Sequence, residues 1–166
     1  HRNIPVFVFN NLSRVRYRAD DILAFFYSFG HIGGLVNIFF ALLNGASLYI
    51  FDLKEQSGAE LARILRSEKI TIFPATPSLF RVVANSLKKR EKLPFVRAVI
   101  LAGETVWQRD FLLFKKHFSS RCFFINRLGH TAFSTFLEFC AAAKTRFTGD
   151  LVPVEKAVWH SRLMKK

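Results

Sequence analysis

Two short segments near the middle of the chain hold residue types that could bind or act on a small molecule. The first is Ala102-Gly103-Glu104, and the second runs from Asn126 to Ala132 and contains Thr131. A glycine lets a backbone turn sharply and approach another group closely, and a threonine hydroxyl both donates and accepts hydrogen bonds. Taken alone, the first segment also fits the start of a helix in any α/β protein, and Thr131 also fits a tight turn.

The rest of the sequence gives no sign of a nucleophile or of a metal centre. We find no nucleophile placed with a histidine and an acid, and Cys122 and Cys140 lack metal-ligand spacing. Both cysteines lie in apolar runs, so we expect reduced thiols in the core of a cytoplasmic protein.

The two segments resemble the paired adenine- and phosphate-binding segments of the AMP-forming adenylate ligases. This superfamily comprises acyl-CoA synthetases, luciferases and nonribosomal peptide synthetase adenylation domains, and its members usually read Gly/Ala-Gly-Glu and aromatic-Gly-x-Thr-Glu. Other stretches resemble the family in the same order: His1-Arg2-Asn3, Phe29 to Leu35, Ala41 to Ala46, Tyr49 to Glu55, Ile70 to Ser78 and Lys115 to Phe118. We therefore expect a partial adenylation domain over residues 1–154 and an aberrant or frayed tail over 155–166.

The resemblance implies roles for individual residues of the two segments. The backbone around Gly103 would border the adenine, and a side chain there would block close approach. Leu128 stands where the family usually places an aromatic ring that stacks on adenine, and Thr131 would act as the catalytic residue by hydrogen-bonding the α-phosphate. The implied nucleotide-binding set is Ala102, Gly103, Glu104, Asn126, Leu128, Gly129, His130 and Thr131.

The resemblance also implies a substrate pocket. His31, with Gly33 and Gly34, would line the pocket for the acid, close to the entrance for the thiol acceptor. The alternative for His31 is a histidine at the start of a helix, hydrogen-bonded to the backbone.

One position departs from the family pattern. Ala132 occupies the place of a glutamate that helps to hold Mg²⁺ against the phosphates, and alanine offers no oxygen ligand. The next acid, Glu138, we expect to be a solvated strand residue. ATP, AMP and Mg²⁺ are thus cofactors of the parent family, and we expect no metal ligand in this chain.

The resemblance favours one function over two others. The chain begins where the family's phosphate loop should end and stops before its lysine-bearing C-terminal domain, so we expect an internal fragment that is inactive alone. The parent enzyme would convert a carboxylic or amino acid to an adenylate and pass it to CoA or a carrier protein. The alternatives are a noncatalytic remnant or interaction module, and a basic nucleic-acid or membrane-surface binder.

The charge balance bears on the third possibility. The chain has 25 Lys and Arg against 12 Asp and Glu, a net charge of +13. The basic residues stand in short scattered groups, such as Lys88-Lys89-Arg90, without the aromatic pattern of a base-stacking platform. We therefore expect a solvated basic surface and no specific nucleic-acid partner.

Four apolar, β-rich runs predict the sheet that must position these residues: Ser47 to Phe51, Ile70 to Phe73, Val96 to Leu101 and Cys122 to Ile125. Segments of helical periodicity separate them. This alternation predicts a layered α/β fold, with a mostly parallel sheet and helices on both faces. Two further β-like stretches, Phe133 to Cys140 and Arg146 to Val154, suggest that the sheet order turns over after Ile125.

Cap residues place the helices. Ser57 with Glu60 predicts a capping box, Thr76 before Pro77 predicts another helix start, and a further helix is expected over Gln108–His117. The uncharged run from Ile22 to Phe51 is long enough to span a membrane, but glycines and asparagines interrupt it. We expect a buried helix, from about His31 to Asn44, followed by a strand.

Overall fold

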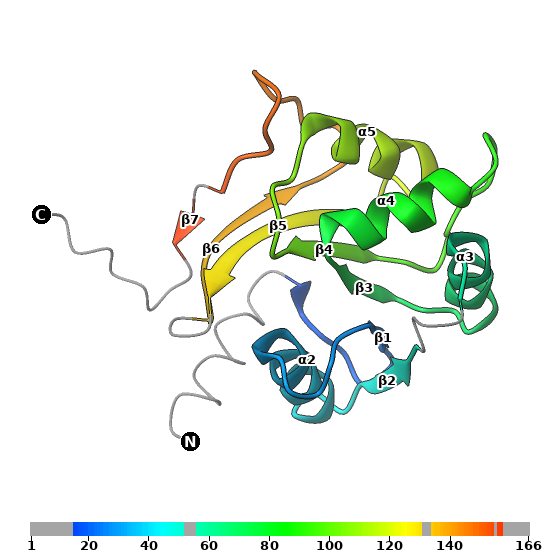
Figure 1. Cartoon of the computed structure of the whole chain (residues 1–166), viewed down its shortest axis with the longest axis vertical. Coiled ribbons are helices and arrows are strands. Elements are labelled where there is room, and N and C mark those ends of the chain that lie inside the picture. Colours follow the sequence, from blue (N-terminus) through cyan, green and yellow to red (C-terminus); the bar gives the residue numbers. More distant parts are fainter. Residues whose placement is uncertain (1–14, 52–55, 131–133, 155, 158–166) are drawn as a thin grey trace, which may run out of the picture.

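The computed structural model describes residues 15–51, 56–130, 134–154 and 156–157. Within them, seven strands form one sheet in the order β2-β1-β3-β4-β5-β6-β7 (Figure 1). The strands are β1 (Ile22–Phe25), β2 (Ser47–Ile50), β3 (Ile72–Ala75), β4 (Ala98–Ala102), β5 (Phe123–His130), β6 (Ser134–Ala141) and β7 (Lys156–Ala157). The helices are α2 (Ile32–Leu42), α3 (Gly58–Ser67), α4 (Pro77–Ser86) and α5 (Gln108–His117).

The sheet is parallel from β2 to β5 and antiparallel from β5 to β7. Helix α2 packs on one face, and α3, α4 and α5 pack on the other (Figure 1). The predicted α/β class, with a mostly parallel sheet and helices on both faces, is confirmed. The sheet order does not turn over after Ile125 as expected, because β6 and β7 continue outward from β5; what changes there is strand direction, since β6 runs antiparallel to β5.

Local signals place the helices as expected. The Thr76 side chain accepts a hydrogen bond from the Leu79 amide with Pro77 in the first turn, and α5 has the predicted bounds. Ser57 accepts from the Glu60 amide at 3.2 Å. This is one half of the predicted capping box. In place of the other half, the Glu60 carboxylate pairs with Arg63 at 2.6 Å.

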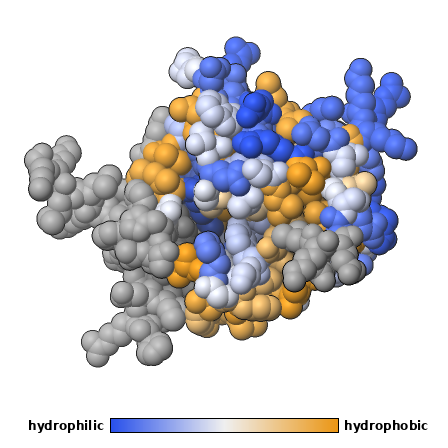
Figure 2. Space-filling model, in the orientation of Figure 1, coloured by the Kyte–Doolittle hydropathy of each residue, from blue (hydrophilic) through white to orange (hydrophobic). Residues whose placement is uncertain are grey.

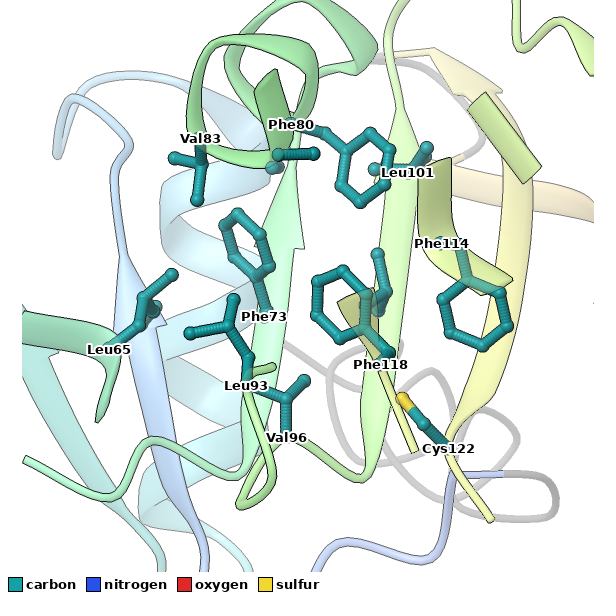
Figure 3. Close-up of a cluster of buried hydrophobic side chains, with 14 of the residues drawn as sticks. Leu65, Phe73, Phe80, Val83, Leu93, Val96, Leu101, Phe114, Phe118 and Cys122 are labelled. Carbon is teal, nitrogen blue, oxygen red and sulfur yellow. The ribbon is translucent and has the colours of Figure 1, made fainter. Parts of the chain in front are cut away.

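The larger core lies between the sheet and helices α3 to α5. Phe73, Phe80, Phe114, Phe118 and Phe124 are each at most 3% exposed, and Figure 3 shows aromatic rings from β3, α4 and α5 meeting over the sheet. Aromatic pairs with ring centres 5–7 Å apart add attraction beyond the apolar area that they bury. This rigid layer holds the starts of α4 and α5 against the ends of β3 and β4.

Two predictions about strands need correction. β1 was not predicted, because its four residues are part of the long uncharged run that was interpreted as a helix followed by a strand; the turn signals Ser28 and Gly30 before α2 were not used. The stretch from Arg146 to Val154 is not a strand; it forms one isolated bridge, between Leu151 and Trp107, and it contacts the sheet through side chains of β5 and β6. Phe147 instead packs edge-on against Phe111 of α5, with ring centres 4.7 Å apart.

The predicted tail is described only in part. Residues Lys156–Ala157 pair with Leu137 and Glu138 of β6. The other residues of 155–166 lie outside the described part of the chain, so the expectation of a frayed tail stays a prediction.

A polar cluster ties the amino ends of the strands together. The Asp21 carboxylate is 2% exposed and accepts hydrogen bonds from Arg97 and, at 2.7 Å, from the Thr71 hydroxyl. Burial alone would raise the pKa of Asp21, but the hydrogen bonds from Arg97 and Thr71 outweigh it, and the pKa lies below its usual value. Arg97 also donates to the carbonyl of Val15. The cluster thus links β4 to β1 and to the segment before it.

The long uncharged run does not form a single helix. It folds as β1, α2 and β2, and none of the helices in the described ranges is long and apolar enough to span a bilayer. The run instead leaves apolar side chains on the surface around α2 and the edge strand β2: Phe29, Leu35, Leu42, Leu43 and Ile50 are 44–66% exposed.

Candidate functional site

The strand order switches direction between β1 and β3. From β1 the chain crosses one face of the sheet through α2 to β2, and from β2 it returns over the other face through α3 to β3, beside β1. Ligands of open α/β sheets bind at such a switch in strand order, outside the carboxyl ends of the strands. The starts of α2, α4 and α5 and the turn after β4 all lie at this edge (Figure 1).

The first predicted segment forms the turn at the end of β4. Gly103 has a φ of +90°, a left-handed conformation that favours glycine. A Cβ added there would meet no protein atom closer than the Thr76 Cγ2, at 4.0 Å. Glycine is therefore required by backbone conformation and not by crowding within the protein, and the space above the turn is open.

Glu104 fastens this turn to the neighbouring helix. Its Oε2 accepts hydrogen bonds from the Ser78 amide at 3.1 Å and from the Ser78 hydroxyl at 2.5 Å. A carboxylate in the first turn of a helix also favours the positive end of the helix dipole. Sequence reasoning did not assign Ser78 to the site, because the partners lie 26 residues apart.

An ion pair between a partly exposed arginine and a buried aspartate joins the starts of α4 and α5. Arg81 donates to both oxygens of Asp110, at 2.7 and 2.9 Å, and to the carbonyl of Thr105. Asp110, fully buried, also accepts from the Trp107 amide at 2.9 Å. A bidentate arginine–carboxylate pair fixes both side chains in direction as well as in distance. Residues 103–107 are thus held at both ends.

The second predicted segment lies on β5, next to β4. Ala102 pairs with Arg127, so the exposed Leu128 follows beside the Gly103 turn. The Asn126 amide donates to the carbonyls of Val152 at 2.9 Å and Pro153 at 3.2 Å.

The described part of this segment ends with β5. β5 extends through Gly129 to the backbone of His130, with a register shift between Leu128 and Gly129. Thr131 and Ala132 lie outside the described residues.

The predicted substrate-pocket residues form the start of α2. His31 caps this helix, and its Nδ1 accepts from the Gly33 amide at 3.1 Å, which is the alternative that the sequence left open. A Cβ at Gly34 would stand 2.4 Å from the Ser28 carbonyl oxygen, and one at Gly33 would stand 3.2 Å from the Tyr27 ring. Both glycines therefore allow α2 to pack closely on residues 27–28.

Glu138 is not a solvated strand residue, and that prediction is wrong. It is 3% exposed, and its Oε2 accepts from the Arg127 Nε at 2.8 Å. The two residues pair across β5 and β6 on the face that α2 covers, with the guanidinium 5.8 Å from the Phe40 ring centre. Because this carboxylate is committed to Arg127, it is no substitute for the acid missing at Ala132.

Two tyrosines complete this buried polar cluster. Tyr17 stacks on Phe40 with ring centres 5.1 Å apart. Burial raises the pKa of Tyr27 to about 12, although the nearby positive charge of Arg127 opposes this. Burial likewise raises the pKa of Tyr17, against the same opposing charge. Neither phenol is prepared to act as a base near neutral pH.

The described residues do not fit a magnesium site. No group of three or more His, Cys, Asp or Glu side chains comes together in the part of the chain that the structure describes. Glu104 and Glu138, the acids nearest to the two segments, are held by Ser78 and Arg127. At a nucleotide, Mg²⁺ is usually held by one or two carboxylates together with phosphates and water; since both of these carboxylates already have partners, we derive no catalytic step through the metal.

A layered, mostly parallel α/β sheet with an open glycine turn at its carboxyl edge is the architecture of the doubly wound α/β proteins, which bind their ligands at that edge. The chain belongs to the AMP-binding enzyme family, whose profile matches residues 1–157.

Two curated proteins are similar in sequence to this chain. The chain is 28% identical over 134 residues to surfactin synthase subunit 2 of Bacillus subtilis (strain 168), covering 79% of this chain and 4% of that protein. It is 30% identical over 118 residues to a plipastatin synthase polypeptide of the same organism, covering 68% of this chain and 4% of that protein. The chain thus spans a small part of the curated relatives that it matches.

The fold is similar to that of a solved adenylation domain. The Vibrio cholerae adenylation domain AlmE, in complex with glycyl-adenosine-5'-phosphate, matches with a TM-score of 0.80 at 16% identity, covering 94% of this chain and 29% of that chain.

Proposed function

We propose that this chain is part of the large domain of an AMP-forming carboxylate ligase. The parent reaction joins a carboxylic or amino acid to ATP, giving an acyl- or aminoacyl-adenylate and pyrophosphate, and then transfers the acyl group to the thiol of CoA or of a carrier protein. The observation that carries the proposal is the left-handed Gly103 turn at the carboxyl edge, fastened by Glu104 and flanked by the exposed Leu128.

Individual residues have distinct roles in this proposal. The backbone of Ala102 and Gly103 borders the adenine, and the Leu128 side chain gives apolar contact with the ring where an aromatic residue would stack. Asn126 acts indirectly, by holding the 152–153 backbone beside β5. Glu104 acts in the same way through Ser78.

The remaining predicted residues contact the phosphate and the acid. Thr131 binds the α-phosphate through its hydroxyl as the catalytic residue, with Gly129 and His130 in the same segment. The start of α2, with His31, Gly33 and Gly34, borders the acid. When bound, Mg²⁺ would offset phosphate charge, but Ala132 leaves this chain without the family's ligand. We therefore propose that the chain alone does not complete the reaction.

We also propose a cytoplasmic location, where thiols stay reduced. Cys122 is buried and forms no disulfide, and burial raises the pKa of its thiol well above the usual value, which makes it unreactive.

Nucleotide binding by the 166-residue chain tests the proposal. We expect weak binding of AMP and weaker binding of UMP, measured by saturation-transfer NMR, because the open turn at Gly103 suits a purine. Gly103→Ala should abolish the AMP signal. Gly149→Ala is the matched control, since Gly149 has a similar φ of +99° and no neighbour within 4 Å of an added Cβ. Equal loss in both variants, or equal signals for AMP and UMP, would contradict the proposed site.

A second assay addresses catalysis. We expect no carboxylate-dependent exchange of pyrophosphate into ATP by this chain, and no rescue by Ala132→Glu. In a longer protein that supplies the phosphate loop and the C-terminal lysine domain, Ala132→Glu should raise the exchange rate by restoring metal ligation. Exchange by the unmodified chain would show that the roles given to Ala132 and to the other parts are wrong.

A noncatalytic remnant is the second candidate. Ala132 and the commitment of Glu138 to Arg127 favour it, since the chain keeps the fold without a free acid at that position. A remnant would bind no AMP and would gain no activity from Ala132→Glu in any longer protein.

A further inference from the structure

The fold gathers basic residues that the sequence leaves in separate groups. The loop after α4 and the end of α5 meet at the amino edge of the sheet: the Leu93 amide donates to the His117 carbonyl, and the Lys92 ammonium donates to the Lys116 carbonyl at 2.5 Å. The basic edge consists of Lys88, Lys89, Arg90, Lys92, Lys115, Lys116 and Arg121, all of them exposed.

The loop that carries Lys88 to Lys92 also contains an acid, Glu91, but its charge is taken up by Arg66. Glu91 accepts from Arg66 at 2.8 Å and from the Lys88 amide at 2.9 Å. Arg66 also donates to the Lys92 carbonyl, so Arg66 and Glu91 lie at the same edge as an ion pair and leave its net charge unchanged. Lys115 and Lys116 favour the negative end of the α5 dipole, but Lys88 to Lys92 lie beyond the end of α4 and have no such role.

An apolar tip lies in the same loop. Between the buried Leu93 and Val96, Pro94 is exposed and Phe95 is 44% exposed. Figure 2 shows hydrophilic side chains projecting on the right, where Figure 1 draws the loop after α4. The strands run away from this edge, so it lies at the end of the sheet opposite the Gly103 turn.

We propose that the basic edge docks the protein on an anionic lipid surface, with Phe95 entering the headgroup layer. Each lysine or arginine near such a surface contributes attraction, and an aromatic side chain among cations adds an apolar contact. Nucleic acid fits the edge less well, because single strands are held by several aromatic rings along a groove, and Phe95 is the exposed ring in this loop. Docking in this way leaves the carboxyl edge free for nucleotide.

Co-sedimentation with vesicles tests the proposal on the whole 166-residue chain. We expect binding to phosphatidylcholine vesicles that contain phosphatidylserine at about a third of the lipid, and no binding to phosphatidylcholine alone. Binding should weaken steeply between low and high salt, because the ions screen exposed charges.

A pair of charge-matched variants separates the edge from the net charge. Lys88→Glu with Lys89→Glu should weaken vesicle binding at least about 30-fold. Arg63→Glu with Arg109→Glu lowers the net charge equally at exposed positions outside the edge, and should retain most of the binding. Circular dichroism checks that both variants fold. Equal losses in the two variants would overturn the proposal.

Two further measurements test whether the basic edge binds lipid or nucleic acid. Phe95→Ser should weaken vesicle binding by roughly tenfold, from the loss of a partly buried aromatic contact. Polyuridylate, a flexible polyanion, should displace the chain from the vesicles only by non-specific electrostatic attraction. If polyuridylate binds the chain more tightly than the vesicles do, and Lys88→Glu with Lys89→Glu abolishes that binding, the edge serves nucleic acid and the lipid proposal is wrong.

Discussion

The buried ion pair between Arg127 and Glu138 allows a quantitative test of how this fold tolerates charge in its core. Both side chains are at most 7% exposed, and Glu138 lies directly across from Arg127 in the β5–β6 register. Removing one member of such a pair leaves the other charge buried without its counter-charge, which costs about 3–5 kcal/mol. Replacing both by apolar residues of similar volume removes that penalty.

We therefore expect Arg127→Met and Glu138→Leu each to lower the free energy of unfolding by about 3–5 kcal/mol at pH 7. The double variant should lose far less than the sum, and should lie within about 2 kcal/mol of the unmodified chain. Pulse proteolysis across a urea series measures all four proteins at low concentration, which limits aggregation.

The exposed pair of Glu60 and Arg63 is the control for this cycle, since it joins the same types of charge at 2.6 Å on the surface of α3. Its coupling should be too small to measure, because water screens exposed charges. If the coupling between Arg127 and Glu138 is equally small, the pair is not buried as described, and the assignment of Glu138 to the core fails.

Three other properties can be tested directly. Asp21→Asn should destabilise the chain at pH 7, and by progressively less as pH falls from the usual carboxyl pKa of 3.8 through the lower pKa of folded Asp21, because the stability from that carboxylate is lost over this range; a destabilisation that stays constant in unfolding curves across the acidic range would contradict this. Ser78→Ala should increase amide hydrogen exchange in the turn at Glu104, and unchanged exchange would contradict the clasp. The chain should bind a hydrophobic dye strongly, and Leu42→Lys with Leu43→Lys should reduce the fluorescence; a signal that does not change would place the exposed apolar surface elsewhere.

The sequence predicted elements whose signals are local. Thr76 and Pro77 are adjacent in the sequence and together indicate the start of α4. The apolar run before Gly103 is long enough to indicate a buried strand. β1 escaped prediction because its residues differ little in hydropathy from those of the neighbouring helix, and the turn residues Ser28 and Gly30 that follow it were not used to divide the run.

The parts of the site that were missed depend on contacts between distant residues. No residue near Glu104 in the sequence indicates that its carboxylate accepts hydrogen bonds from Ser78. Glu138 also resembles a solvated strand residue until the pairing of β5 with β6 brings it opposite Arg127. One signal was available for Glu138: in an alternating strand, a charged residue on the inward face needs a buried partner of opposite charge. The roles of Thr131 and Ala132 rest on the family resemblance, since they lie outside the described residues.

The switch in strand order has a consequence for how the protein opens. β3, β4 and β5 are joined by ladders of four and five paired positions, whereas β1 and β3 share a single one, Leu23 with Ile72. Local unfolding begins where backbone pairing is sparsest. The unit from β1 through α2 to β2 is held to the rest mainly by the Asp21–Arg97 cluster and by the packing of α2 on the sheet, so it should separate as one cooperative piece when those contacts break, at a lower free energy than global unfolding. The hinge for that motion coincides with the part of the carboxyl edge where a nucleotide and an acid would meet.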